Sequence, residues 1–219
     1  MEVKLKKEFV SFLIESNVLK FGEFTTKSNR KTPYFINTGN FKYGKQLNVL
    51  SKFYADFIVN SKVEYDCLFG PAYKGISLVV ACCNALYEHH KINKPFFFNR
   101  KEIKDHGEGG SFIGHKPKEG EKIIIIEDVL TAGTAVKEIL PILKKQYNVE
   151  CSNMFVLVNR CEFGSHKNIK ASDELKEKFG LTVNSLISIK DIVEFLESNS
   201  KYEEFKKSMQ NYINSYCIL

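Results

Sequence analysis

Apolar residues recur at helical spacing in two segments near the N-terminus. Steps of three and four residues predict a first helix that ends near Lys20, with an apolar face of Leu5, Phe9, Phe12 and Leu13. The same pattern predicts a second helix, with an apolar face of Leu47, Leu50, Tyr54, Phe57 and Ile58. Between them, FGEFTTKSNRKTPYFIN predicts a β-hairpin that turns at residues 28–30. Residues 1–42 are therefore expected to form an N-terminal flap of one helix and one hairpin.

The rest of the chain alternates between short apolar runs and helical patterns. Strands are expected in YDCLFG, KPFFFN and NMFVLVNR, at Lys122–Glu127 and at Val183–Ile189. Helices are expected at about 76–87, after residue 133, at 173–179, and near 191–197 and 202–216. Residues 100–121 form a long polar segment. The predicted strands are apolar on both faces, so both faces of the sheet they form are expected to be buried. This pattern indicates an α/β fold with a mostly parallel central sheet and helices on both faces. We expect a single domain over residues 1–219.

Composition and charge exclude several classes of protein. The chain has 219 residues, of which 43% are hydrophobic, so a packed core is expected and disorder is not. No apolar run approaches the roughly 18 residues of a membrane span, and the N-terminus has the pattern of a helix, not of a signal peptide. The net charge of +6 is spread along the chain. This spread favours a solvated basic surface or a small polyanionic ligand over nucleic acid, for which clustered cations are expected.

Cysteine and histidine pairs do not predict a metal or redox site. None of the six cysteines belongs to a C-x-x-C motif, which favours reduced structural thiols and a cytoplasmic protein. Cys82 and Cys83 are most simply explained by helix packing. His89 and His90 are adjacent on a predicted helix, where neighbouring side chains do not face each other, so a joint site is not expected.

The stretch IIIIEDVLTAGTA, residues 123–135, carries the clearest chemical signal. Glu127 and Asp128 follow four isoleucines, at the end of a strand where open α/β sheets bind ligands. The small, hydroxyl-bearing residues that follow open a helix, whose free N–H groups form a phosphate cradle. Adjacent carboxylates accept hydrogen bonds from the two hydroxyls of a ribose. The stretch therefore predicts a sugar-phosphate site, although a buried strand with an acidic helix cap is the alternative reading.

The motif has neither the G-K-[ST] of a P-loop nor a G-x-G-x-x-G. It resembles the phosphoribosyl diphosphate signature of type I phosphoribosyltransferases. FGEFTTKSNRKTPYFIN, FGPAYKGI and NRKEIKDHGEGG resemble the orotate phosphoribosyltransferases, in the same order and at similar spacing. The resemblance runs from about Phe12 to Arg160 and continues more loosely to the C-terminus.

This resemblance implies the fold, reaction and partners of that family. The implied fold is that of the type I phosphoribosyltransferases. The implied reaction transfers phosphoribosyl from 5-phosphoribosyl 1-diphosphate to orotate, giving orotidine 5'-monophosphate and pyrophosphate in UMP biosynthesis. The implied cofactor is Mg²⁺, bridging substrate oxygens without a protein ligand. A homodimer that exchanges a mobile loop is implied, whereas a complex with orotidine monophosphate decarboxylase stays open.

The resemblance also implies a role for each matching residue. Contacts to orotate and the phosphoribosyl group are implied for Lys27, Phe35, Ile36 and Arg160. Pyrophosphate contacts are implied for Tyr73, Lys74, Arg100, Lys101, Lys104 and His106. Contacts to the ribose hydroxyls are implied for Glu127 and Asp128, and contacts to the 5-phosphate for Thr131, Ala132, Gly133, Thr134 and Ala135. Val129 and Leu130, between these two groups, are expected to bind substrate as well. The residues expected to act in catalysis are Lys101, Lys104, His106 and Asp128. Taken alone, Arg160 is equally consistent with a surface salt bridge.

Four positions depart from the family pattern without removing an essential group. Asn29 replaces a glycine, Ile36 an aromatic residue, and Glu127 and Asn159 replace aspartates. Two other functions stay open on the residues alone. A purine or uracil phosphoribosyltransferase would not explain KDHGEGG or Arg160. A non-catalytic regulator that binds nucleic acid would need a clustered basic face.

Overall fold

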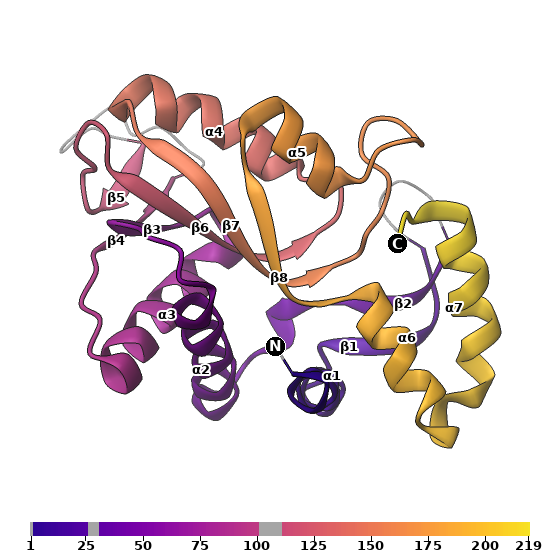
Figure 1. Cartoon of the computed structure of the whole chain (residues 1–219). Coiled ribbons are helices and arrows are strands. Elements are labelled where there is room, and N and C mark those ends of the chain that lie inside the picture. The colour runs from indigo at the N-terminus through magenta and orange to yellow at the C-terminus, as the bar shows by residue number, and fades with distance from the viewer. Residues whose placement is uncertain (1, 26–30, 101–110) are drawn as a thin grey trace.

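The computed structural model describes residues 2–25, 31–100 and 111–219 (Figure 1). Within these residues, the central sheet has six strands in the order β5-β4-β3-β6-β7-β8. Its strands are β3 (Cys67–Gly70), β4 (Phe96–Asn99), β5 (Phe112–Gly114), β6 (Lys122–Leu130), β7 (Glu150–Asn159) and β8 (Thr182–Ser188). Every neighbouring pair is parallel except β4 and β5, which are antiparallel. The predicted mostly parallel sheet is confirmed.

Helices cover both faces of this sheet. Figure 1 shows α2 (Gly44–Ser61) and α3 (Lys74–His90) on one face, and α4 (Thr134–Tyr147) and α5 (Ala171–Phe179) on the other. The isoleucines of β6 alternate between the two cores: Ile124 and Ile126 pack on the α3 side, and Ile123 and Ile125 on the α4 side. Successive side chains of a strand point to opposite faces, so four consecutive isoleucines are needed to fill both cores.

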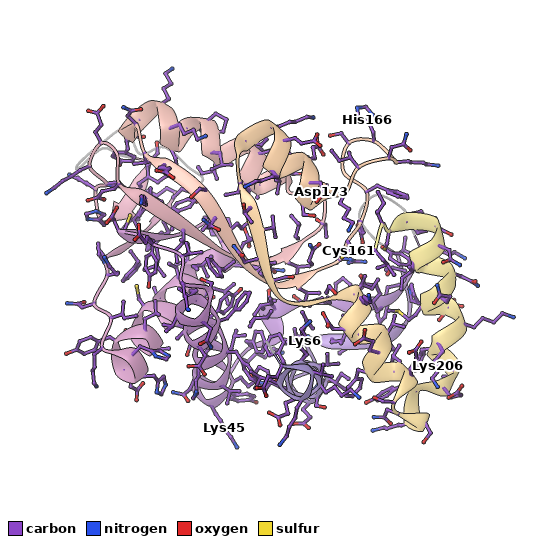
Figure 2. The ribbon with its side chains drawn as sticks, in the orientation of Figure 1. Lys6, Lys45, Cys161, His166, Asp173 and Lys206 are labelled. Carbon is purple, nitrogen blue, oxygen red and sulfur yellow. The ribbon has the colours of Figure 1, made fainter. Side chains whose placement is uncertain are left out.

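The N-terminal flap packs against the C-terminal helices. It consists of α1 (Val3–Glu15) and an antiparallel hairpin of β1 (Leu19–Thr25) and β2 (Lys31–Ile36). A 3₁₀ turn, η1 (Thr38–Asn40), leads from the hairpin toward α2. The chain ends with α6 (Ile189–Glu197), the 3₁₀ turn η2 (Ser200–Tyr202) and α7 (Glu203–Tyr216). Lys6 on α1 points toward α6, where its Nζ lies 2.8 Å from Asp191 Oδ1 (Figure 2).

The first helix ends earlier than the sequence predicts. It stops at Glu15 instead of near Lys20, because Asn17 takes a left-handed φ of 57° and Leu19 already belongs to β1. Asparagine is one of the few residues that adopt this conformation readily, so it ends the helix. The predicted hairpin is confirmed by the pairing of β1 with β2. Its predicted turn at residues 28–30 lies outside the described residues.

Two strand predictions also need correction. β6 continues beyond Glu127 to Leu130, because Val129 and Leu130 keep pairing with β7. β5 lies within the polar segment 100–121, where the sequence pattern predicts no strand, and its Phe112 packs against the rings of Phe69 and Phe97. Among the described residues, no helix is long and apolar enough to cross a membrane.

Candidate active site

Two loops face each other across the carboxyl ends of β3 and β6 and enclose a cleft of about 240 Å³. One loop lies between β3 and α3, and the other between β6 and α4. The lining residues are Pro71, Ala72, Tyr73, Lys74, Glu127, Asp128, Val129, Leu130, Thr131, Gly133, Thr134, Ala135, Val136 and Met154. The structure thus brings together two stretches that the sequence singled out separately, FGPAYKGI and IIIIEDVLTAGTA.

The first loop is narrow because glycines occupy both of its ends. A Cβ atom at Gly70 would lie 2.2 Å from the backbone oxygen of Gly75, which is too close for any other residue. Glycine at position 70 therefore allows the two ends of the loop to approach each other and the turn between them to be compact. The amide of Ala72 donates to Asn99 Oδ1 at 2.8 Å, which ties the loop to the end of β4. The chain then enters α3 at Lys74. The loop therefore delivers Tyr73 and Lys74 to the cleft at the N-terminus of a helix.

Asp128 is the best-connected side chain of the cleft. Its Oδ2 accepts hydrogen bonds from Thr38 Oγ1 at 2.7 Å and from Lys74 Nζ at 2.9 Å, and its Oδ1 accepts one from the Val129 amide at 2.7 Å. Burial opposes the charged form, but the charge of Lys74 and these hydrogen bonds outweigh it and lower the pKa of Asp128. Asp128 is therefore a buried carboxylate that keeps its charge, and Lys74, half-exposed, lies between it and solvent.

Glu127 lies beside Asp128 with the opposite electrostatic character. Burial and the negative charge of Asp128 raise the pKa of Glu127 to about 8. Its Oε1 accepts a hydrogen bond from the Asp128 amide at 2.9 Å, and its backbone carbonyl accepts one from the hydroxyl of Tyr54 on α2. The pair therefore presents one charged carboxylate and one carboxyl group that holds a proton at neutral pH.

The second loop has the backbone form of an anion site. Gly133 has a left-handed φ of 70° and immediately precedes α4, whose first residue is Thr134. Thr131 and Thr134 are exposed at the cleft, and their neighbours Ala132 and Ala135 are small. The first N–H groups of a helix lack intrahelical partners and carry the positive end of its dipole. The loop therefore offers backbone donors and hydroxyls to an anion.

Arg160 lies apart from the cleft, in a buried cluster below α7. Its Nη2 donates to Tyr212 Oη at 3.0 Å and to Thr32 Oγ1 at 3.3 Å, and Tyr212 Oη donates to Glu162 Oε1 at 2.6 Å. Arg160 Nε lies 2.6 Å from Glu162 Oε1, as an ion pair whose N–H direction does not make a well-aligned hydrogen bond. The guanidinium also stacks over the ring of Tyr34, at 4.5 Å from its centroid.

The burial of this cluster disfavours the charge of Arg160. The nearby oxygens of Tyr34, Glu162 and Tyr212 outweigh that cost and raise the pKa of Arg160 further above its ordinary value. Arg160 is 6% exposed. The hypothesis that Arg160 forms a surface salt bridge, one of the two that its sequence position left open, is therefore wrong.

The remaining predicted residues are distributed around the cleft. Phe35 on β2 is 41% exposed and stacks on Phe24, with ring centroids 5.5 Å apart. Ile36 beside it is buried. Arg100 follows β4, and its amide donates to Ser111 O at 2.7 Å. Neither these residues nor Arg160 line the cleft itself. The predicted residues Lys27, Lys101, Lys104 and His106 lie outside the described residues.

Three residues that support the cleft were missed from the sequence. Thr38, Tyr54 and Asn99 hold Asp128, Glu127 and the first loop respectively. Thr38 and Tyr54 belong to no motif, and their partners are 90 and 73 residues away along the chain. A signal was available only for Asn99, which ends the predicted strand KPFFFN and is the first residue of the stretch NRKEIKDHGEGG.

Comparison with known proteins agrees with this geometry. The profile of the phosphoribosyl transferase domain family matches residues 39–193. The orotate phosphoribosyltransferase of Clostridium acetobutylicum is 51% identical to the chain, covering 97% of the chain and 98% of the relative. That of Klebsiella pneumoniae is 41% identical, with coverages of 97% and 98%. The crystal structure of the Francisella tularensis orotate phosphoribosyltransferase superposes with a TM-score of 0.85 at 36% identity, covering 96% of the chain and 100% of that structure.

Proposed function

The chain belongs to the orotate phosphoribosyltransferases, and from this premise we propose how its residues perform the reaction of the family. The enzyme transfers the phosphoribosyl group of 5-phosphoribosyl 1-diphosphate to orotate, with orotidine 5'-monophosphate and pyrophosphate as products. The observation that carries the assignment of roles is the cleft that joins Lys74, the two carboxyl groups and the N-terminus of α4. In 5-phosphoribosyl 1-diphosphate, the ribose lies between a diphosphate and a 5-phosphate. A cation, a pair of carboxyl groups and a helix N-terminus match these three parts in turn.

The ribose is assigned to Glu127 and Asp128. A charged Asp128, fixed by Thr38 and Lys74, presents a rigid acceptor for a ribose hydroxyl. Glu127, which holds a proton in the free enzyme, can donate or accept and lies on the same strand end. Neighbouring hydroxyls of one ribose are thereby met by neighbouring side chains. Val129 and Leu130 continue the strand and keep both carboxyl groups at the floor of the cleft.

The 5-phosphate is assigned to the loop from Thr131 to Ala135. The glycine turn at Gly133 exposes the first amides of α4, and the two threonines supply hydroxyl donors. Helix N-termini bind phosphate because unpaired N–H groups and the helix dipole act together. This places the phosphate at one end of the cleft and leaves the other end, at Tyr73 and Lys74, for the diphosphate.

The diphosphate is assigned to the loop of Tyr73 and Lys74. Lys74 is half-exposed where it pairs with Asp128. A bound diphosphate can therefore interact with the positive charge of Lys74 while the ion pair between Lys74 and Asp128 stays intact. The cleft donors are carboxyl and hydroxyl oxygens, which suit a hard cation such as Mg²⁺. Mg²⁺ would bind together with the substrate and without a direct protein ligand, beside the carboxyl groups of Glu127 and Asp128, and it would supply positive charge against the departing pyrophosphate. Arg100, Lys101, Lys104 and His106 are assigned to the same leaving group.

Orotate is assigned to the flap side of the site, where Phe35 offers an exposed apolar edge and Ile36 packs in the core beside it. Lys27, which lies outside the described residues, is assigned to the same substrate as a cation. Arg160 pairs with the orotate carboxylate in this proposal, for which a planar guanidinium is suited. Its Nε and Nη2 are engaged by Glu162, Tyr212 and Thr32, so the carboxylate would use Nη1. The cluster then fixes the orientation of Arg160 before orotate binds.

Catalysis follows from charge placement. Orotate is already anionic, so the reaction needs no strong base. Positive charge develops at C1 of the ribose and negative charge on the pyrophosphate. Cations fixed at the leaving group stabilise the transition state more than the ground state. Lys101, Lys104 and His106 are assigned this role, and Asp128 holds the ribose while its C1 carries positive charge.

A homodimer that exchanges the segment after Arg100 completes the proposal. A test mixes a Lys101→Ala chain with an Asp128→Asn chain, each inactive alone. If the segment serves the partner subunit, a heterodimer contains one site with both residues intact. Random exchange of subunits makes about half of the dimers heterodimers with one intact site, so roughly a quarter of wild-type activity should return. A mixture that stays inactive after confirmed exchange shows that the segment serves its own chain.

Three further assignments complete the description. We assign residues 1–219 to one phosphoribosyltransferase domain, with residues 1–42 as its flap, because α1 and the hairpin share a core with α6 and α7. All six cysteines are free thiols, which supports a cytoplasmic enzyme. A complex with orotidine monophosphate decarboxylase would let the product pass directly to the next step, and co-purification of the two proteins tests it.

The reaction is tested with purified protein, Mg²⁺, orotate and 5-phosphoribosyl 1-diphosphate. Orotidine 5'-monophosphate should form, whereas uracil or adenine in place of orotate should give little product. Removal of Mg²⁺ with a chelator should stop the reaction. Efficient turnover with a purine base, or undiminished turnover without a divalent cation, would refute the assigned substrate or cofactor.

A further inference from the structure

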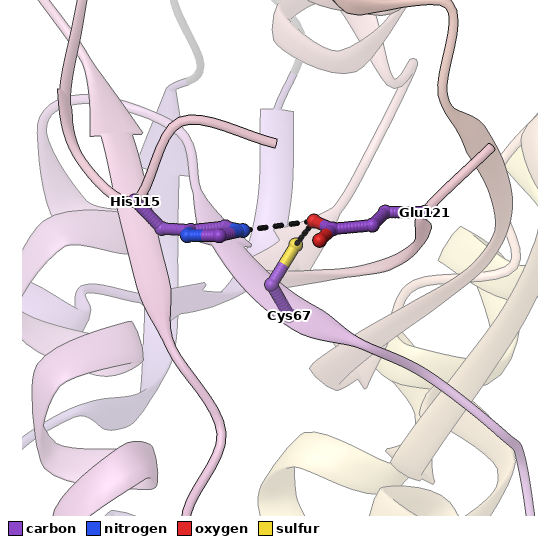
Figure 3. Close-up of side chains that lie close together, drawn as sticks. All are labelled: Cys67, His115 and Glu121. Atoms are coloured by element: carbon purple, nitrogen blue, oxygen red, sulfur yellow. Dashed lines mark hydrogen bonds and ion pairs between the residues drawn. The ribbon is translucent and has the colours of Figure 1, made fainter. Parts of the chain in front are cut away.

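Cys67, His115 and Glu121 form a compact cluster (Figure 3). It lies where β3 and β6 begin, whereas the cleft lies where these strands end. Cys67 begins β3, whose other end, Gly70, leads into the first cleft loop. His115 follows β5, and Glu121 precedes β6. His115 Nε2 lies 2.8 Å from Glu121 Oε2, and Cys67 Sγ lies 3.9 Å from the same oxygen. The three possible ligand atoms all lie within 4.8 Å of one another.

We propose that Cys67, His115 and Glu121 bind one divalent transition-metal ion of the Zn²⁺ class. Thiolate, imidazole and carboxylate are the three ligand types of zinc in proteins, and three protein ligands leave a fourth position for water. In a tetrahedral site with ordinary zinc bond lengths, ligand atoms lie about 3.3–3.6 Å apart. Side-chain shifts of about 1 Å would bring these three atoms to that spacing. Mg²⁺ is excluded as the occupant, because it does not take thiolate ligands.

The backbone at each ligand is already fixed. Cys67 pairs with Ile123 across β3 and β6, and the amide of His115 donates to Phe96 O at 3.0 Å. The carbonyl of Glu121 accepts a hydrogen bond from the Glu150 amide at 3.0 Å. Three ligands on three paired segments need little ordering to bind a cation, which reduces the entropy cost of forming the site.

The electrostatics and access of the cluster suit a cation. Burial and the charges of Glu121 and Asp66 raise the pKa of Cys67, so the free thiol keeps its proton. The same negative charges attract a divalent ion, which displaces the proton of the Cys67 thiol. Cys67 is fully buried, whereas the side chains of His115 and Glu121 are 23% and 20% exposed. The ion therefore enters from the His115 side.

A bound ion would join the start of β3, the exit of β5 and the entry of β6. It would act as a structural cross-link, without a part in phosphoribosyl transfer. Among the described residues, this is the one group of three cysteine, histidine or acidic side chains with the proximity a metal ion requires. The cluster was not visible in the sequence, because Cys67 and Glu121 lie 54 residues apart and form no spacing motif.

The test titrates the full chain with Co²⁺ under reducing, metal-free conditions and follows the thiolate-to-cobalt charge-transfer absorption. One Co²⁺ per chain should bind with this band, Zn²⁺ should displace it, and Zn²⁺ should raise the melting temperature. Cys67→Ser should abolish the band. His115→Ala and Glu121→Gln should each weaken binding by about 100-fold or more, beyond the loss that removal of a supporting residue causes.

Three variants serve as controls. His90→Ala removes a histidine whose Nε2 also lies 2.8 Å from a carboxylate, that of Asp56, but without a thiol. Cys83→Ser removes a half-buried thiol elsewhere, and Asp128→Asn removes the carboxylate of the active-site cleft. All three should keep the band. Absence of the band in the wild type, or a band that survives Cys67→Ser or the His115 and Glu121 variants, overturns the proposal. Glu121→Gln keeps the test decisive if Cys67→Ser does not fold, because Glu121 lies at the partly exposed rim.

Discussion

Asp128 and Arg160 are both buried charged residues at the ends of neighbouring strands, but their surroundings differ. Asp128, on β6, has a half-exposed lysine as its partner and borders an open cleft. Arg160, just after β7, is enclosed by Tyr34, Glu162 and Tyr212, and its carboxylate partner is only 4% exposed. The first charge is held in place for a ligand that arrives from solvent. The second is already compensated within the protein.

The difference separates two uses of a buried charge. A charge that faces a cleft contributes to function because its remaining hydrogen-bonding capacity meets a substrate. A charge that is enclosed contributes to stability only as part of its group, and removal of one member leaves the others desolvated. We therefore expect substitutions in the Arg160 cluster to change the free energy of unfolding most, and substitutions at the cleft to change turnover most.

The largest effect is expected for Arg160→Ala. It removes the cation 2.6 Å from the buried carboxylate of Glu162, which should lower the free energy of unfolding by about 3–5 kcal/mol. Chemical denaturation measures this loss. Lys52→Ala, which removes one partner of the exposed Lys52–Asp56 pair, is the control and should cost less than about 1 kcal/mol. A similarly small loss for Arg160→Ala would contradict the comparison. Orotate binding would then be the one role that remains assigned to Arg160.

Asp128→Asn comes next and should act on turnover. Loss of the charge that holds the ribose should lower activity by roughly 100-fold or more, which corresponds to about 2.7 kcal/mol of transition-state stabilisation. The free energy of unfolding should change little, because Asn keeps the shape and accepts from Thr38. Steady-state kinetics and denaturation are measured side by side, with Asp56→Asn as the control. Near-normal turnover would refute the role assigned to Asp128.

A smaller effect is expected for Thr38→Val. The substitution keeps the shape but removes the hydroxyl that donates to Asp128 at 2.7 Å, and kcat/KM should fall about tenfold, or about 1.4 kcal/mol. Thr32→Val is the matched control, since Thr32 is also buried but contacts Arg160 at 3.3 Å. Its kcat/KM for 5-phosphoribosyl 1-diphosphate should stay near that of the wild type. Equal losses of this kcat/KM in the two variants would show that the regions do not differ as described.

A change of one pH unit is expected to have the smallest effect. The pKa of Glu127 rises from its ordinary value of 4.5 to about 8 in the folded protein, so folding binds a proton between these values. The stabilisation by this proton is complete below pH 4.5 and is lost as pH rises through 8. Stability relative to Glu127→Gln should therefore decline over that range, by less than about 1.4 kcal/mol per pH unit, the limit for one proton. A flat difference between the two proteins would contradict the raised pKa.

Local patterns in the sequence predict the sheet, most helices and the core of the cleft. The isoleucine run, the two acids and the following loop are adjacent in sequence, so their joint position at a strand end follows from the strand itself. Glycines at both ends of the first loop likewise act within six residues. These features need no knowledge of distant contacts.

The supporting contacts were not predictable in this way. Thr38 reaches Asp128 across 90 residues, and Tyr212 reaches Arg160 across 52. Hydroxyl groups of this kind are common in any sequence and gain a role only when the fold places a charge beside them. The end of α1 and the presence of β5 were missed for a related reason. Each depends on the pairing of a short segment with a strand that is remote in the chain.

The extension of β6 to Leu130 has a consequence for hydrogen exchange. Ile124 and Ile125 pair with β3 on one side and with β7 on the other, whereas Glu127, Val129 and Leu130 pair with β7 alone. The loop at 131–133 belongs to neither ladder. Amide protection should therefore have three levels along one short segment: highest at the isoleucines, lower at Glu127 and Asp128, and lowest in the phosphate loop. Local opening would thus release the phosphate loop first, while Glu127 and Asp128 stay anchored to β7.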